Sequence, residues 1–340
     1  MKKNIKTPQE EIDFVILWVD GSDPEWKKQK SKYSHDSKDD DRPQRYRDFG
    51  MLRYWFRGVE KFAPWVRNIY FVTWGHLPEW LDTSNPKLRI VNHADYMPAE
   101  YLPTFSSHPL ELNLYRIKGL SEQFVYFNDD VFLIDHTKPE DFFKGGKPVD
   151  MLALQPDVAN PVFPVMSYIH MNNALLISRH FDKRTQMKRF KGKFFHLGYP
   201  LMHFGYNILE IVFPRYTGFY TVHGPSPLLK STCETIWAEE EELLDEVSRH
   251  RFRNREDVSQ FIFREWQKQS GEFVPVNLHR RFRYFEVGKN MREAVKVIRK
   301  QKRRMICLND PDIEIDFEAD RETLCNALEE IMPEPSSFEK

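Results

Sequence analysis

The chain has few cysteines, and their scarcity excludes several classes of protein. Only Cys233, Cys307 and Cys325 occur among 340 residues, widely spaced and odd in number. This pattern argues against both a disulfide framework and a zinc knuckle. A reducing, cytoplasmic environment is therefore expected.

Long hydrophobic runs and a charge excess are also missing. No stretch is long and apolar enough to span a bilayer. The first residues, Met1 to Glu11, lack the apolar centre of a signal peptide. With 50 basic and 51 acidic residues, the formal net charge is −1. Because no global positive field is present, nucleic acid is not expected as a partner.

The sequence does contain enough apolar residues for a large core, at 41% hydrophobic and 14% aromatic. In the first half, strand-like runs alternate with helical ones, which favours an α/β fold with a mainly parallel sheet. Strands are expected at residues 12–19, 69–73, 88–91 and 124–127, and helices at residues 49–62 and 110–117.

The second half is mostly helical beyond Cys233, with apolar stripes at helical spacing. Strict alternation over residues 312–317 indicates an edge strand, and a last helix is expected with Asp320 as its N-cap. We expect an α/β core over residues 10–230, a helical part over 231–305, and a C-terminal strand and helix over 306–340.

Two acidic clusters follow two of the expected strands. Residues 20–23 (Asp-Gly-Ser-Asp) end the first strand, and Asn128, Asp129 and Asp130 end the strand at 124–127. The carboxyl ends of parallel strands meet at one edge of a sheet, so these groups can share a site. Either they only form turns, or Asp20, Asp129 and Asp130 hold a hard cation on a diphosphate.

Arginine and histidine supply complementary groups. Arg45 and Arg53 lie near the start of the expected helix at 49–62, and Arg116 precedes the second acidic strand. Guanidinium groups bind phosphate oxygens in pairs, although most arginines are solvated or paired with nearby acids. His223 lies in a strand-like segment that breaks into a Pro-rich turn, which suits a cleft imidazole; the alternative is a structural, hydrogen-bonded histidine.

These residues carry a specific resemblance to a known family. Residues 12–26, 45–72, 102–133 and 223–257 resemble the four conserved regions of the Stealth family. The motifs include Leu102-Pro103-Thr104-Phe105-Ser106-Ser107, Asn128-Asp129-Asp130-Val131 and the run from Glu60 to Tyr70. The family comprises hexose-1-phosphate transferases of bacterial capsule and cell-surface polysaccharide synthesis, related to the animal N-acetylglucosamine-1-phosphotransferase.

The resemblance implies a reaction. A family member moves a hexose-1-phosphate from a UDP-sugar to a hydroxyl of a polysaccharide or lipid-linked oligosaccharide, forming a phosphodiester and releasing UMP. It also implies a nucleotide-sugar-binding core resembling glycosyltransferase A, and association with the inner-membrane assembly machinery at its cytoplasmic face. The family positions that match functional ones are Arg53, Ser107, Glu111, Asp130, His223 and Arg253.

The chemistry of these residues and the family resemblance are consistent with one mechanism. Mg²⁺ or Mn²⁺ on Asp130, with Asp129 or Asp20, would neutralise the diphosphate, and Arg53 and Arg253 would clamp its oxygens. Ser107, Arg45 and Arg116 complete the expected donor site. His223 acts as general base or as covalent nucleophile, and Glu111 orients the sugar or takes the proton. The alternatives are a metal-dependent glycosyltransferase that releases UDP and a non-catalytic carbohydrate-binding protein.

Overall fold

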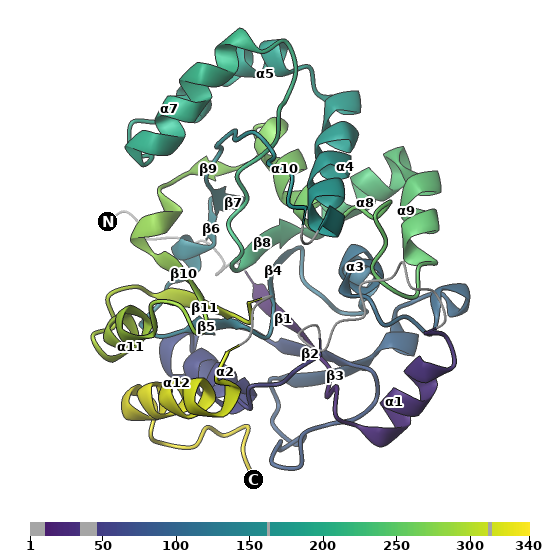
Figure 1. The fold of residues 1–340 in the computed structure, drawn as a ribbon, viewed down its shortest axis with the longest axis vertical. Coiled ribbons are helices and arrows are strands. Elements are labelled where there is room, and N and C mark those ends of the chain that lie inside the picture. Colours follow the sequence, from purple (N-terminus) through teal and green to yellow (C-terminus); the bar gives the residue numbers. More distant parts are fainter. Residues whose placement is uncertain (1–10, 35–45, 162–163, 312–314) are drawn as a thin grey trace, which may run out of the picture.

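A five-stranded sheet forms the centre of the molecule, with strand order β3-β2-β1-β4-β8 (Figure 1). The computed structural model describes residues 11–34, 46–161, 164–311 and 315–340. Strands β1 (Ile12–Trp18), β2 (Ile69–Thr73), β3 (Leu88–Asn92) and β4 (Gln123–Phe127) run parallel, and β8 (Ser226–Leu229) is antiparallel to β4. The predicted α/β class with a mainly parallel sheet is confirmed.

The strands β1, β2 and β4 are buried on both faces, which explains why they are almost continuously apolar. Successive side chains of a strand point to opposite faces. Phe14 and Ile16 of β1 therefore pack into one apolar cluster, and Val15 packs into the other.

The helices cover the two faces. The cluster around Phe14 contains side chains of α2 (Leu52–Phe62), α11 (Met291–Arg299) and α12 (Phe317–Ile331). The cluster around Val15 contains side chains of α3 (Ser107–Leu112), α4 (Pro164–His180), α8 (Lys230–Glu239), α9 (Glu241–Ser248) and α10 (Phe261–Gln269). The remaining helices are α1 (Pro24–Ser31), α5 (Lys183–Arg189), α6 (Lys191–Phe194) and α7 (Leu201–Leu209).

Two smaller sheets flank the centre, each of three strands. One has the order β10-β11-β5, from β10 (Phe282–Glu286), β11 (Met305–Asn309) and β5 (Val131–Leu133). The other contains β6 (Phe143–Lys144), β7 (Lys147–Asp150) and β9 (Val274–Pro275). Strand β11, which the sequence analysis did not predict, brings Cys307 opposite Val131 and so beside the second acidic cluster.

The C-terminal residues are integrated into the main core. Leu308 of β11 and Leu324 of α12 belong to the same buried cluster as Phe14. The expected edge strand at 312–317 falls partly outside the described residues, but Phe317 already begins α12. Asp320 is therefore inside the helix, and the expectation that it caps the helix is wrong. Asp316 is the N-cap, and its carboxylate accepts from the backbone N–H of Ala319.

One further helix differs from its prediction. The segment expected at 110–117 begins earlier, at Ser107, and ends in a separate 3-10 turn, Leu114–Arg116. No helix among the described residues has both the length and the apolar character needed to cross a membrane.

Candidate active site

A cavity of about 450 Å³ opens where β1 and β4 end. Leu17 and Trp18 line it from β1, Val19 lines it just after β1, and Asn128, Asp129 and Asp130 line it from the turn after β4. This is the edge of a parallel sheet at which ligands bind. Other polar residues that line the cavity include Arg47, Asp48, Ser107, His108, Glu111, His223, Arg253, Asn309 and Asp310.

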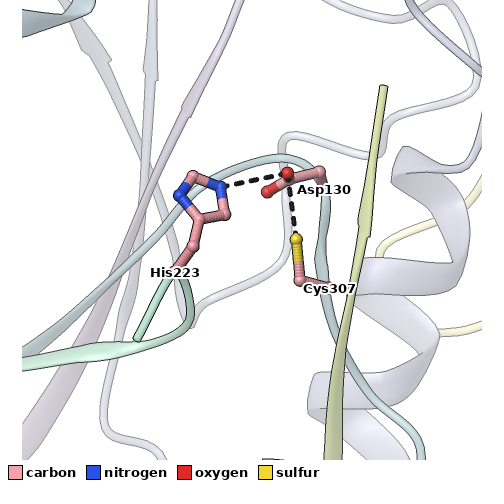
Figure 2. A group of neighbouring side chains, drawn as sticks. All are labelled: Asp130, His223 and Cys307. Carbon is pink, nitrogen blue, oxygen red and sulfur yellow. Dashed lines mark hydrogen bonds and ion pairs between the residues drawn. The ribbon is translucent and has the colours of Figure 1, made fainter. Parts of the chain in front are cut away.

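Asp130 and His223 face each other in this cavity (Figure 2). The Nε2 atom of His223 lies 3.1 Å from Oδ2 of Asp130 and 3.2 Å from Nδ2 of Asn128. Burial alone would lower the pKa of His223, but the charge and hydrogen bond of Asp130 raise that pKa above its ordinary value. The second ring nitrogen points away from Asp130 (Figure 2).

Cys307 completes the surroundings of Asp130. Its thiol donates to Oδ2 of Asp130 at 3.1 Å. Burial, and then the nearby negative charge of Asp130, raise the pKa of Cys307 well above its ordinary value, so the thiol stays protonated as a donor. Burial would raise the pKa of Asp130, but His223 and Cys307 outweigh it, and that pKa lies below its ordinary value.

Asp129 and Asp48 add two more carboxyl groups to the cavity. Asp129 keeps exposed surface, but desolvation by the surrounding cavity, followed by the negative charges of Asp130 and Asp48, raises its pKa to about 7. Burial also raises the pKa of Asp48. Neighbouring carboxylates repel one another unless a proton or a cation offsets their charge.

These carboxyl groups fit a divalent cation. The Oδ1 atom of Asp130 is buried and accepts no hydrogen bond from any described residue. Buried polar atoms normally have a partner, and Mg²⁺ or Mn²⁺ takes carboxylate oxygens as ligands. Asp130 and Asp129 would hold such an ion. One Asp130 oxygen, the His223 nitrogen and the Cys307 sulfur also lie within 4.8 Å of one another, but a hard cation prefers oxygen ligands.

Asp20 lies close to the cavity but does not line it. Its carboxylate accepts from the backbone N–H and the hydroxyl of Ser22, at 2.8 and 2.6 Å. The next residue, Gly21, packs so tightly that a Cβ atom there would lie 2.1 Å from the carbonyl oxygen of Tyr46. The first acidic motif therefore allows the close approach of the segment that bears Asp48.

Helix α3 contributes Ser107 and Glu111, one turn apart, to the cavity. The hydroxyl of Ser106 accepts from the backbone N–H of His108 at 3.4 Å and caps this helix. Glu111 is buried, and its Oε1 atom accepts from the hydroxyl of Tyr126 at 3.0 Å. Ser107 and Glu111 therefore lie in the same cavity as Asp130 and His223.

The loop at residues 249–257 brings Arg253 to the same cavity. A guanidinium nitrogen of Arg253 lies 3.4 Å from the hydroxyl oxygen of Ser107. The loop is fixed by the buried carboxylate of Asp257, which accepts from Nδ1 of His108 at 2.8 Å and from Nδ1 of His250 at 2.6 Å. This shared acceptor holds the loop against α3, so Asp257 positions Arg253.

Two of the predicted arginines, Arg53 and Arg116, are described by the structure and do not line the cavity. Arg53 lies on α2 with its guanidinium 5.6 Å from the Trp80 ring centroid. Arg116 donates to the side chain of Asn113 at 2.8 Å, and its guanidinium stacks 4.7 Å from the Trp237 ring centroid. Its guanidinium is therefore directed away from the cavity in which a sugar donor would bind. Arg45 lies outside the described residues.

Asp48, Asp310 and Cys307 lie at the site but were not among the predicted residues. Arg47 donates twice to the carboxylate of Asp310, at 2.8 and 2.5 Å, and both residues line the cavity. Asp48 lies only five positions before Arg53, inside a segment already identified as conserved in the family. Cys307 gave no local signal, because it reaches Asp130 only through the pairing of β11 with β5.

Comparison with known proteins identifies relatives of the whole chain. Models of two Stealth conserved regions match it, region 1 at residues 10–38 and region 2 at residues 45–150. The capsular polysaccharide phosphotransferase WcwK of Streptococcus pneumoniae is 42% identical over 339 residues, which cover 97% of this chain and 99% of the relative. The exopolysaccharide phosphotransferase cps2G of Lactiplantibacillus plantarum is 38% identical, covering 97% and 96%.

Similar solved structures are far more distant. The galactosyltransferase LgtC, solved with donor and acceptor sugar analogues, is 10% identical with a TM-score of 0.42, covering 93% of this chain and 95% of that one. Mouse xyloside xylosyltransferase 1 is also 10% identical, with a TM-score of 0.34. Such distant similarity does not transfer residue roles.

Proposed function

This chain belongs to the Stealth family, and we propose that it is a polysaccharide phosphotransferase that moves a hexose-1-phosphate from a UDP-sugar to an acceptor hydroxyl. The product is a phosphodiester, and UMP leaves. The acceptor is a hydroxyl of a capsular or other cell-surface polysaccharide, or of its lipid-linked precursor. Membership rests on relatives that match the chain almost end to end.

The observation that supports this proposal most strongly is the Asp130–His223 pair in a cavity that also holds Asp129 and Arg253. Attack on a diphosphate needs charge neutralisation and in-line positioning more than covalent chemistry from the protein. Here carboxylates for a cation, a guanidinium for phosphate oxygens and an imidazole for a proton converge from distant parts of the chain. A bound Mg²⁺ or Mn²⁺ would neutralise the diphosphate and stabilise the leaving UMP.

The residues of this chain take the following roles. Arg253, placed by Ser107 and the Asp257 network, binds donor phosphate oxygens, since a guanidinium fork matches them. His223 accepts the proton of the acceptor hydroxyl through Nδ1, because its other ring nitrogen, Nε2, carries a hydrogen that it donates to the Asp130 carboxylate. Asp130 orients the imidazole and stabilises its protonated form. Glu111, buried and bonded to Tyr126, orients the sugar.

We assign His223 the role of base, and the alternative role of covalent nucleophile can be tested by stereochemistry. A direct displacement inverts the configuration at phosphorus, whereas two displacements through phosphohistidine retain it. A donor made chiral by sulfur at the transferred phosphorus should give a product of inverted configuration. Retention would assign His223 the nucleophilic role.

The decisive assay separates phosphotransfer from ordinary glycosyl transfer. A panel of UDP-sugars is incubated with the enzyme, Mg²⁺ and an oligosaccharide acceptor, and the released nucleotide is identified. We expect UMP, with a phosphodiester ³¹P signal in the product. UDP release would instead identify a glycosyltransferase acting at the anomeric carbon.

Asp130→Asn is the matched control for that assay. It keeps the shape of the side chain and removes the charge, so turnover should fall on the order of 10³-fold while the fold is retained. Absence of turnover in the unaltered protein across the panel, with sugar binding intact, would identify a carbohydrate-binding protein.

A further inference from the structure

Helix α7 and the 3-10 turn that continues it, η6 (Glu210–Val212), have an inverted polarity. The buried positions are polar, since His203, Asn207 and Glu210 are each at most 1% exposed. Their spacing of four and three residues places them on one helix face. The exposed positions are apolar, which is the reverse of a surface helix in a globular protein. They include Leu201, Met202, Ile208, Leu209, Ile211 and Val212.

Polar contacts fix this orientation. Asn207 accepts from the backbone N–H of Leu154 at 2.7 Å and donates to the carbonyl of Leu152 at 3.0 Å. Glu210 forms an ion pair with Lys183, and both side chains are 1% exposed. Rotating the helix to bury its apolar face would break this pair and leave buried charges without partners. The outward apolar face is therefore a stable feature of the fold.

The exposed apolar surface is concentrated in a short segment. Eight of the fifteen exposed large apolar side chains in the described ranges fall between Leu197 and Phe213. Leu197 is 90% exposed, Leu201 87% and Val212 73%. Single exposed apolar residues are ordinary, but a concentration of this kind marks an interaction surface.

Basic residues adjoin this surface along the chain. We call residues 183–213 the arm; all of them are described, and α5 and α7 run along the upper edge of the molecule (Figure 1). The exposed charged side chains of the arm are all basic: Arg184, Lys188, Arg189 and Lys191. Its single acidic residue, Glu210, is buried in the pair with Lys183.

From this combination we propose that the arm docks on the surface of an anionic lipid bilayer. The apolar side chains of α7 and η6 enter the boundary between headgroups and acyl chains, and the basic side chains of α5 and α6 contact lipid phosphates. Apolar insertion and basic attraction together are what interfacial binding requires. Exposed charges of a single, positive sign favour a surface dense in phosphate groups over an uncharged protein surface. The inference does not depend on which group the active site transfers.

The experiment measures co-sedimentation of the full chain with vesicles. Vesicles of phosphatidylcholine with about one third phosphatidylglycerol are compared with vesicles of phosphatidylcholine alone, at low and high salt. We expect binding to the anionic vesicles, weakened by salt, because the attraction to lipid phosphates is screened. Failure of the protein to bind anionic vesicles at low salt would overturn the proposal.

Two sets of substitutions test the two parts of the surface. Each should weaken binding to anionic vesicles about tenfold or more. The apolar set is Leu201→Gln, Ile208→Gln and Leu209→Gln, and its matched control on α4 is Tyr168→Gln, Met171→Gln and Leu175→Gln. The basic set is Arg184→Gln, Lys188→Gln, Arg189→Gln and Lys191→Gln, and its matched control is Arg292→Gln, Lys296→Gln, Lys300→Gln and Lys302→Gln.

All these positions are exposed, so the variants should keep the Tm of the parent protein, and circular dichroism checks this. Equal losses in the controls and the arm variants would overturn the assignment to the arm. Sedimentation velocity tests the competing occupant. A dimer that the apolar set dissociates, with vesicle binding unchanged, would assign this face to a second copy of the chain and overturn the bilayer proposal.

Discussion

The Nε2 atom of His223 lies 3.1 Å from Oδ2 of Asp130, although 93 residues separate them in the chain. Each group changes the pKa of the other: Asp130 raises the pKa of the imidazole, and His223 lowers the pKa of the carboxyl group. The carboxylate stabilises the protonated ring, and the protonated ring stabilises the carboxylate. His223 can therefore act as a base whose protonated form is stabilised during the reaction.

The first prediction is that Asp130→Asn lowers the pKa of His223. The raised pKa comes from the negative charge and hydrogen bond of Asp130, and the uncharged amide removes the charge. In the variant, burial has the largest effect on the pKa of His223, and burial favours the neutral ring. NMR titration of the His223 ring protons, without added metal, measures the change directly. The ring of His250, which pairs with Asp257, serves as the internal reference.

The same prediction has a kinetic form. In the unaltered enzyme the rate should rise with pH as His223 loses its proton, and because a cation on Asp130 offsets the carboxylate charge, the acid limb should lie below the pKa that NMR gives without metal. A His223 pKa that is unchanged by Asp130→Asn would show that the pair is not coupled as described.

Local pattern predicted much of this fold and site. Continuous apolar runs identified β1, β2 and β4, because strands buried on both faces have little choice of residue, and a shorter apolar run identified the edge strand β3. The acidic turn after β4 could be placed at the ligand-binding edge from strand direction alone. The structure accordingly brings Asp130, Ser107 and Glu111 into one cavity.

The remaining features depend on contacts between distant segments. Cys307 meets Asp130 only because β11 pairs with β5, and nothing near residue 307 signals this pairing. Arg116 was expected at the donor site from its place before β4. The 3-10 turn at Leu114–Arg116 instead directs its guanidinium toward Trp237. A single turn of 3-10 helix in place of α-helix directs a side chain to a different place, and the spacing of apolar residues in the sequence does not distinguish the two.

The second prediction concerns Arg253 and its neighbour Arg255. Arg253→Lys should lower kcat/KM about tenfold to a hundredfold, because a lysine cannot make the paired hydrogen bonds of a guanidinium to phosphate. Arg255 lies in the same loop, but its side chain is 70% exposed and outside the cavity. Arg255→Lys is therefore the matched control and should retain full activity. Equal losses in the two variants would point to loop stability and not to phosphate binding.

The third prediction concerns Asp257, which joins His108 to His250. Asp257→Asn should lower the free energy of unfolding by about 3 kcal/mol, because it removes a buried charge that two imidazoles share. It should also lower kcat/KM, since the loop with Arg253 loses its anchor. Urea denaturation measures the first effect. Glu293→Gln, which removes an exposed ion pair with Arg283, should change stability little.

The destabilisation should itself depend on pH. The pKa of Asp257 is lowered in the fold, because hydrogen bonds from the histidines outweigh burial, so its contribution disappears as acid protonates it. The pKa of His250 is raised, first by its hydrogen bond to Asp257, so its contribution disappears as pH rises through that value. The difference in unfolding free energy between the parent protein and Asp257→Asn should therefore be largest between the ordinary pKa values of aspartate and histidine, from about 4 to about 6.5. A difference that is constant from pH 3 to pH 9 would contradict this account.

The fourth prediction links cation binding to the proton on Asp129. The pKa of Asp129 is about 7, so near neutrality a proton competes with any cation for this carboxyl group. The affinity for Mn²⁺, measured by electron paramagnetic resonance, should therefore rise as pH increases through about 7. Asp48→Asn removes one of the charges that raise this pKa, so the rise should move to lower pH.

Asp20→Asn separates this effect from a general loss of negative charge. The Asp20 carboxylate already accepts two hydrogen bonds from Ser22 and does not line the cavity, so its replacement should leave the midpoint of the Mn²⁺ rise almost unchanged. Equal shifts in the Asp20 and Asp48 variants would mean that the cation responds only to the overall field of the acidic groups. A shift confined to Asp48→Asn would instead identify Asp48, Asp129 and Asp130 as one electrostatic unit, in which the proton on Asp129 is what the cation must displace.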